Sequence, residues 1–196
     1  MTKTLATHWK IYWVWVAITL LIYLAMILWS LPKISEMAGG ALAFDLRPAG
    51  YSFDEARSFL TSLGPEGADF YLHTQQLLDT AYPGMLGVTL VGALIGLDRG
   101  GWGWVLSVFA ISGSIFDYFE NIAVRSMLIT GSGNVTNKMV EEASSWTFLK
   151  SVCDSIAMIG LLFLVLIALY RYFSSNKARE DISETIAKKD EEPQEK

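Results

Sequence analysis

A run of 21 residues without a charged side chain, from position 11 to position 31, is the feature of this sequence that most restricts its fold. A helix of about 20 apolar residues crosses the hydrocarbon core of a bilayer. The apolar core of a cleavable signal peptide is shorter, about 7–15 residues. The run therefore predicts a retained transmembrane helix.

Three further apolar runs follow, at about 77–97, 102–128 and 146–173. Together with the first run they predict an all-α integral membrane protein, a four-helix transmembrane bundle that occupies residues 1–173. The mixed-charge segment 174–196 is expected to be a disordered cytoplasmic tail.

Composition agrees with this class and excludes several others. Hydrophobic residues make up 52% of the chain and charged residues 18%, whereas an ordinary soluble domain has about 25% charged residues. A single cysteine and two histidines do not suffice for a disulfide framework or a multi-histidine metal or haem site, so no metal is expected and no cofactor is indicated. The net charge of −5 gives no electrostatic reason to expect a nucleic-acid partner, and the lipid bilayer is the expected surrounding.

The distribution of Lys and Arg predicts the orientation of the bundle. These residues are more frequent on the side that carries both chain ends, so both termini are expected to be cytoplasmic. The connection between the first two spans, residues 33–76, is then extracytoplasmic.

This connection has helical signals of its own. Ser52 and Glu55 have the spacing of a capping box, which predicts an amphipathic helix as far as about Leu63. Gly64 and Pro65 interrupt that helix, and a second helical stretch is expected to continue into the second span. We expect residues 33–76 to form a helical cap over the outer mouth of the bundle.

Several polar and aromatic residues of the cap are candidates for a role. Asp45 and Arg47 are expected to form a local pair that stabilises a turn, and a clamp for an anionic headgroup is the alternative. Tyr51 and Tyr71 are expected to pack as interfacial aromatics. His73 is expected to be exposed or hydrogen-bonded, because a lone histidine is not a zinc site.

Glycines recur every four residues in the second span, at Gly92, Gly96 and Gly100. Small residues at this spacing let helix backbones approach closely. Packing inside the bundle is the favoured interpretation. A homo-oligomer, or a membrane-protein partner on the same face, is the alternative.

Ionisable and polar residues inside the later spans are the most informative feature of the chain. On the third and fourth helices they follow the i, i+3, i+4 spacing of one helix face, and two more open the second span. The residues concerned are Asp117, Glu120, Asn121, Arg125, Lys150 and Asp154, with Asp79 and Tyr82.

These residues also match in depth. At about 1.5 Å per residue, Asp117 lies about 22 Å from Trp102 and Asp154 about 12 Å from Trp146, so both lie in the outer half of the bundle. A charged group at a helix centre costs about 2.5–3.5 kcal/mol on the insertion scale. The charges should therefore pair, with Lys150 on Asp117, Glu120 or Asp154.

Arg125 is expected to pair with Asn121 or Glu120. Acidic residues still outnumber basic ones in the spans. At least one carboxyl is therefore neutral, or a cation or ligand balances the charge.

Three classes of function fit this pattern. The first is a non-enzymatic auxiliary subunit, or a protein that binds a lipid or small molecule in an acid-rich pocket of the outer half. The second is an intramembrane enzyme that acts on a lipid, with Asp117, Glu120 or Asp154 as general acid or base. The third is a cation- or proton-coupled transport component, which the charge-free inner halves of the spans disfavour. A buried ion-pair network that only fixes the packing of the helices explains the same residues.

Overall fold

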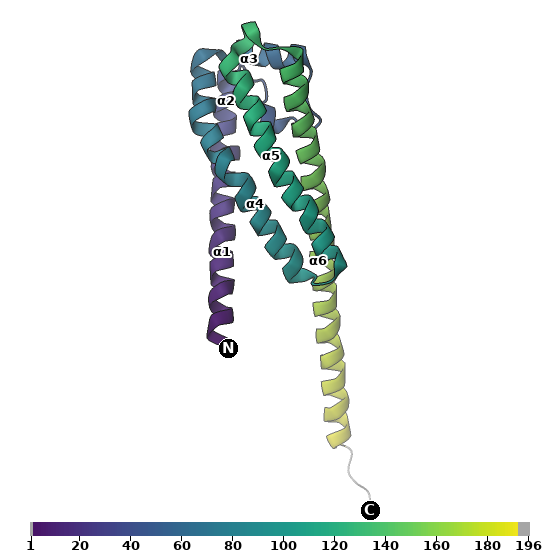
Figure 1. Ribbon diagram of the computed structural model, residues 1–196. Helices are drawn as coiled ribbons and strands as arrows, with labels where there is room; N and C mark the ends of the chain where they lie inside the picture. Colours follow the sequence, from purple (N-terminus) through teal and green to yellow (C-terminus); the bar gives the residue numbers. More distant parts are fainter. Residues whose placement is uncertain (1, 192–196) are drawn as a thin grey trace, which may run out of the picture.

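The computed structural model describes the backbone of residues 2–191 and the side chains of residues 7–176 (Figure 1). Within these limits the chain is helical and contains no strand. The elements are α1 (Thr2–Ala25), η1 (Met26–Ser30), α2 (Leu31–Met37), η2 (Phe44–Leu46), α3 (Phe53–Phe70), η3 (Tyr71–Gln75), α4 (Gln76–Leu97), α5 (Gly101–Asn134) and α6 (Asn137–Glu191).

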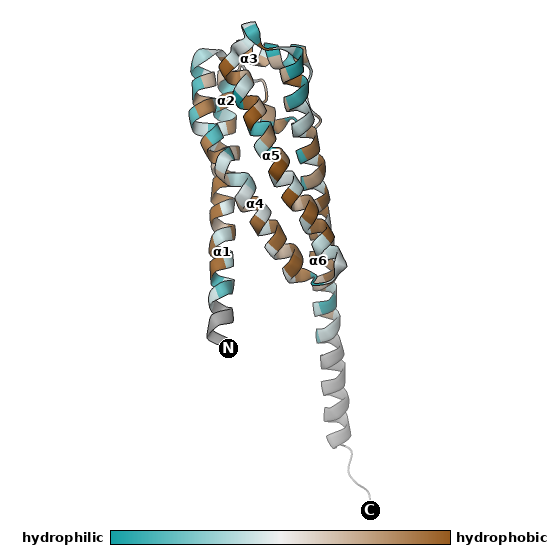
Figure 2. Ribbon diagram, in the orientation of Figure 1, coloured by the Kyte–Doolittle hydropathy of each residue, from teal (hydrophilic) through white to brown (hydrophobic). Residues whose placement is uncertain are grey.

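Four helices in the described part of the chain are long and apolar enough to cross a membrane, namely Thr7–Met37, Phe53–Leu97, Gly101–Asn134 and Asn137–Asn176. Hydrophobic residues dominate their middle and lower parts in Figure 2, and hydrophilic residues gather at the end that carries α3. The prediction of an all-helical, multi-pass membrane protein is confirmed by these lengths and compositions.

The boundaries of the last helices differ from the sequence prediction. The third apolar run is predicted to end at about 128 and the fourth to begin at about 146, but α5 continues to Asn134 with a kink at Gly131 (φ 72°), and α6 begins at Asn137. Hydropathy marks only the part of a helix that lies in lipid, and α6 starts with a polar stretch that precedes its apolar run. The backbone of α6 also continues through the expected tail to Glu191, whereas residues 192–196 lie outside the described part.

The long helices pack in sequence order. α5 packs against both α4 and α6, and α1 packs mainly against α4. Tyr12 and Trp15 of α1 donate hydrogen bonds to the backbone oxygens of Thr89 (2.9 Å) and Met85 (3.1 Å) on α4. A Cβ atom at Gly92 would lie 2.6 Å from the Tyr12 ring. Gly92 therefore serves the contact between α1 and α4, in line with packing inside the bundle.

Residues 38–70, which we call the 38–70 segment, pack at one end of the bundle. Helix α3 contacts α2, α5 and α6 there (Figure 1). The aromatic rings of Phe44 and Phe59 lie 4.7 Å apart and are buried in one core with Val124 of α5 and Val140 of α6. A large apolar contact thus fixes the segment on α5 and α6.

The start of α3 follows the sequence prediction. Ser52 and Glu55 form both hydrogen bonds of a capping box, which satisfies backbone N–H groups at the helix start. Gly64 interrupts the helix with φ 64° and ψ −179°, a backbone conformation that suits glycine. Beyond it the chain continues through η3 into α4, as expected.

Two glycines of α4 form a matched pair for a test of this packing. We expect Gly92→Leu to lower the free energy of unfolding by about 1–3 kcal/mol, because the new side chain collides with Tyr12. Gly96→Leu should leave it unchanged or raise it, since no atom lies within 4 Å of a Cβ there and leucine favours helix. Unfolding of both variants in mixed micelles measures the difference. Equal destabilisation of both variants would contradict the contact.

Candidate functional site

An ion-paired lysine lies at the centre of the polar residues. The Lys150 ammonium group of α6 is 3.4 Å from Asp117 Oδ1 and forms a second ion pair with Glu120, both on α5. The Lys150 side chain is 13% exposed and the Glu120 side chain is fully buried. Thr147, one turn before Lys150, donates a hydrogen bond of 2.6 Å to Glu120 Oε1. The i, i+3 spacing on both helices brings these four groups together.

A second acid reaches the same region from α4. Asp79 is 3% exposed, and its Oδ2 atom accepts a hydrogen bond of 2.9 Å from Gln75 Nε2. Gln75 Oε1 in turn accepts one of 2.5 Å from Ser30 Oγ. This chain of hydrogen bonds connects the first and second spans inside the bundle.

Both Ser30 and Gln75 end a π-helical turn. Ser30 is the last residue of η1 and Gln75 the last residue of η3, and the two turns lie in contact. A π turn adds one residue to a helical turn and is frequent at functional sites. The two turns direct a serine and a glutamine into the protein interior at the level of Asp79.

The 38–70 segment contributes an acid, which a phenol of η3 binds. The hydroxyl of Tyr71, a fully buried residue of η3, donates a hydrogen bond to Asp45 of η2. Asp45 interacts electrostatically with Asp79, Glu120 and Lys150. The expected pair of Asp45 with Arg47 is not formed, because Tyr71 binds the carboxylate.

Tyr51 brings a buried hydroxyl group to the same region. It is 8% exposed, and its backbone N–H donates a hydrogen bond of 2.8 Å to Ser144 Oγ on α6. Its hydroxyl lies near Glu120 and Thr147 but makes no hydrogen bond of normal geometry to any described residue. Burial, and then the Glu120 carboxylate, raises the pKa of Tyr51, so the phenol keeps its proton.

Arg47 does not neutralise the acids. Its guanidinium group donates two hydrogen bonds, of 3.0 and 2.7 Å, to the backbone oxygen of Leu42. It also lies 5.4–5.9 Å from the ring centres of Phe44, Tyr51 and Phe59. Three aromatic rings and a carbonyl thus hold this cation.

We call the interacting groups the buried polar cluster, which consists of Asp45, Asp79, Asp117, Glu120, Lys150 and Asp154 together with Tyr51. Among the described side chains it holds five carboxyls and one ammonium group. Asp154 packs against Gly113, where a Cβ atom would overlap its Oδ1 atom. Within the described residues Lys150 forms ion pairs with Asp117 and Glu120 and not with Asp154.

Three residues predicted for the site lie beside the cluster. Tyr82 stacks on Tyr23 of α1 at 5.8 Å. Asn121 Nδ2 donates a hydrogen bond of 3.0 Å to the backbone oxygen of Asp79. The expected pair of Arg125 with Glu120 or Asn121 is not observed. Glu120 is five residues away, which turns the two side chains by about 140° from each other, and Asn121 donates to Asp79 instead.

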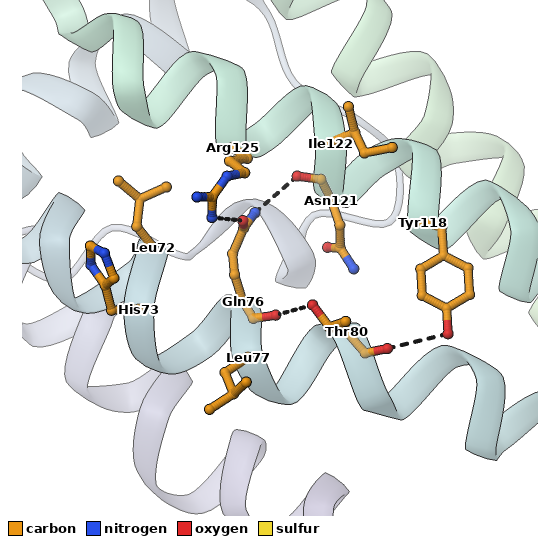
Figure 3. A pocket seen from close by; sticks show the side chains of 9 residues that line it. All are labelled: Leu72, His73, Gln76, Leu77, Thr80, Tyr118, Asn121, Ile122 and Arg125. Atoms are coloured by element: carbon orange, nitrogen blue, oxygen red, sulfur yellow. Dashed lines mark hydrogen bonds between the residues drawn. The ribbon is translucent and has the colours of Figure 1, made fainter.

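Arg125 instead faces a groove between α4 and α5 (Figure 3). Its Nη1 atom lies 3.4 Å from Gln76 Oε1, and Gln76 Nε2 donates a hydrogen bond of 2.9 Å to the backbone oxygen of Asn121. The groove has a volume of about 530 Å³ and is lined by Leu72, His73, Gln76, Leu77, Thr80, Tyr118, Asn121, Ile122 and Arg125. His73 is exposed and pairs with Asp69, which confirms the prediction for it.

Ser30, Gln75 and the buried role of Tyr71 are not predicted from the sequence. A polar residue at the end of an apolar run, and glutamines at the start of another, were the available signals. Only the two π turns direct Ser30 and Gln75 inward.

Comparison with known proteins adds no information on this site. The chain matches no protein-family model, no curated protein and no solved structure. Function must therefore be argued from the geometry of the buried polar cluster and the groove.

Lys150→Met should destabilise the protein by about 3–5 kcal/mol, because it leaves the buried Glu120 and Asp117 charges without their partner. The double variant Glu120→Met with Lys150→Met should regain part of this loss, since it removes both members of one pair and leaves only Asp117 without its partner. Free energies of unfolding in mixed micelles give the coupling energy.

Lys138→Met is the control for this experiment, because Lys138 is an exposed residue of the same helix. It should change stability by no more than about 0.5 kcal/mol. Single and double variants whose effects simply add would show that the ion pair does not stabilise the bundle.

Proposed function

We propose that this chain is a non-enzymatic, multi-pass membrane protein that binds a small amphiphile with a positively charged group in the buried polar cluster. The excess of five carboxyls over one ammonium group carries the proposal. Unpaired charges in a membrane interior are costly and mark functional sites by default. Protonation of a carboxyl or a bound cation removes this cost, and the proposal rests on the second.

An organic ammonium group suits the cluster better than a metal ion. Among the described residues no three His, Cys, Asp or Glu side chains converge as metal ligands. An ammonium group carries several N–H donors, which carboxylates at different distances can accept one by one. It therefore tolerates the spread of the carboxyls over three helices and the 38–70 segment.

Tyr51 supplies a second reason to expect a ligand. A buried hydroxyl without a hydrogen bond costs about 1–3 kcal/mol, and such groups commonly bind a water molecule or a ligand. The phenol oxygen can accept a hydrogen bond from an ammonium group, and the ring can bind the cation through its π face. Both modes fit the ligand class that the carboxyl excess favours.

We further propose that both termini are cytoplasmic and that the 38–70 segment is an extracytoplasmic cap. The distribution of Lys and Arg supports this orientation. The ligand then approaches from the outer leaflet. The backbone of the cap bends at Gly39, Gly40 and Gly50, which all have positive φ angles.

Binding accounts for the structure better than transport or catalysis. The inner part of α4, α5 and α6 is filled by an apolar core of Leu90, Leu94, Ala110 and Ala157. A polar route through the protein would have to displace it. Acid–base catalysis on a lipid by Asp117, Glu120 or Asp154 is the second proposal for the same cluster. It is less favoured because Asp117 and Glu120 already form ion pairs with Lys150. The auxiliary-subunit hypothesis stays a prediction without a structural observation of its own.

The proposed ligand class can be tested with dodecylamine on protein in nanodiscs of a zwitterionic phospholipid. Dodecylamine should raise the unfolding temperature, whereas dodecanol, its neutral analogue, should not. A ligand present at 100 times its Kd stabilises a protein by about 2.7 kcal/mol. Equal shifts with both compounds would contradict recognition of the charge.

Tyr51→Phe separates binding from folding. The variant should be as stable as the natural chain or more stable, because the lost hydroxyl has no hydrogen bond of normal geometry to a described residue, but it should lose at least half of the dodecylamine shift. Tyr172→Phe, at an exposed tyrosine, should retain the full shift. A full shift in Tyr51→Phe would contradict a role for the phenol.

A further inference from the structure

A second apolar hollow continues the groove of Figure 3 along the same two helices. It has a volume of about 520 Å³, and its lining includes Gly84, Val88 and Gly92 of α4, Ser114 of α5 and, at one side, Tyr12 of α1. Gly84 adjoins Tyr118 of the first groove, since a Cβ atom there would lie 2.8 Å from the tyrosine hydroxyl. The two hollows thus follow one face of the α4–α5 pair, and we call them together the α4–α5 furrow.

Glycines of α4, which have no side chain to fill it, line the lower part of the furrow. A Cβ atom at Gly87 would lie 2.5 Å from Ser114 Oγ, so the two helices touch at this point. Val88, one residue on, is 54% exposed. Close backbones with small and branched apolar residues leave a shallow channel on the lipid-facing surface.

The two ends of the furrow lie at different depths in a membrane. Arg125 follows Gly101, the start of α5, by 24 residues, or about 36 Å of helix. The hydrocarbon core is about 30 Å thick, so Arg125 reaches the headgroup layer. Gly92 and Val88 lie about 8–14 Å from Leu97, the end of α4, and so lie within the hydrocarbon core.

The charge at the outer end of the furrow lacks an acidic partner. Arg125 is exposed, and among the side chains that the structure describes it contacts no carboxylate, only the neutral Gln76 at 3.4 Å. The nearby acid Asp69 pairs with His73 instead. Arg125 also faces away from the buried polar cluster. Its guanidinium group is free for a phosphate, which it can bind with two parallel hydrogen bonds.

We propose that the α4–α5 furrow binds one anionic phospholipid, with its phosphate on Arg125 and an acyl chain over Gly84 and Val88. Gln76 and Asn121 line the same groove as Arg125 (Figure 3), and their polar groups are available to the lipid's ester groups in this arrangement. This site is separate from the buried polar cluster and takes a ligand of opposite charge. The failure of either proposal leaves the other intact.

Native mass spectrometry of the full chain in detergent tests this site, with phosphatidylglycerol and phosphatidylcholine of identical acyl chains as probes. We expect the natural chain to bind one phosphatidylglycerol more tightly than phosphatidylcholine. Arg125→Gln should weaken the binding of phosphatidylglycerol about tenfold, the loss of one charge-assisted contact. It should weaken phosphatidylcholine less, because the choline ammonium group already neutralises that phosphate, so the preference for phosphatidylglycerol should fall. Val88→Trp, which fills the furrow, should weaken the binding of both lipids.

Two matched variants complete the experiment. Arg57→Gln changes an exposed arginine of α3, and Val108→Trp changes a valine of α5 that is 62% exposed and does not line the furrow. Both should bind as the natural chain does. An unchanged lipid preference in Arg125→Gln would overturn the proposal. If inorganic phosphate competes for Arg125 while Val88→Trp has no effect, the site takes a free anion and not a lipid.

Discussion

The Lys150 ammonium group, held between the carboxylates of Asp117 and Glu120, links α5 to α6 in the interior of the bundle. The groups around it depend on this link, because fully buried Glu120 also accepts the Thr147 hydroxyl and lies beside Tyr51. A buried ion pair of this kind fixes the register of two helices, since a slip of one residue would leave its charges unpaired. The apolar cores on both sides tolerate such a slip far better.

Around this link the acids extend across the bundle without further bases. Asp79 is tied to the first span through Gln75 and Ser30, and Asp45 is tied to η3 through Tyr71. The single ammonium group cannot balance all the carboxyls at once. The same network can therefore hold the helices together and retain a site for a cation, so the structural and the ligand-binding interpretations are compatible.

The sequence predicts those features that depend on long patterns. The uncharged runs locate the spans, Ser52 and Glu55 locate the start of α3, and helical spacing brings Lys150 to the depth of Asp117 and Glu120. Features that depend on one residue of register escape prediction. The two π turns rotate Ser30 and Gln75 inward, and Arg125 faces the opposite side of α5 from Glu120. Asp45 reaches the cluster only through the fold of the 38–70 segment, which no periodicity encodes.

An experimental density map of the protein, purified from its native membrane in mild detergent, tests the buried polar cluster most directly. The charge excess and the unpaired phenol predict density that does not belong to the chain, in contact with the Tyr51 hydroxyl and at least one carboxylate of the cluster. A cluster closed by protein side chains alone, with Tyr51 hydrogen-bonded to Thr147 or Glu120, would contradict a ligand site and leave a purely structural network.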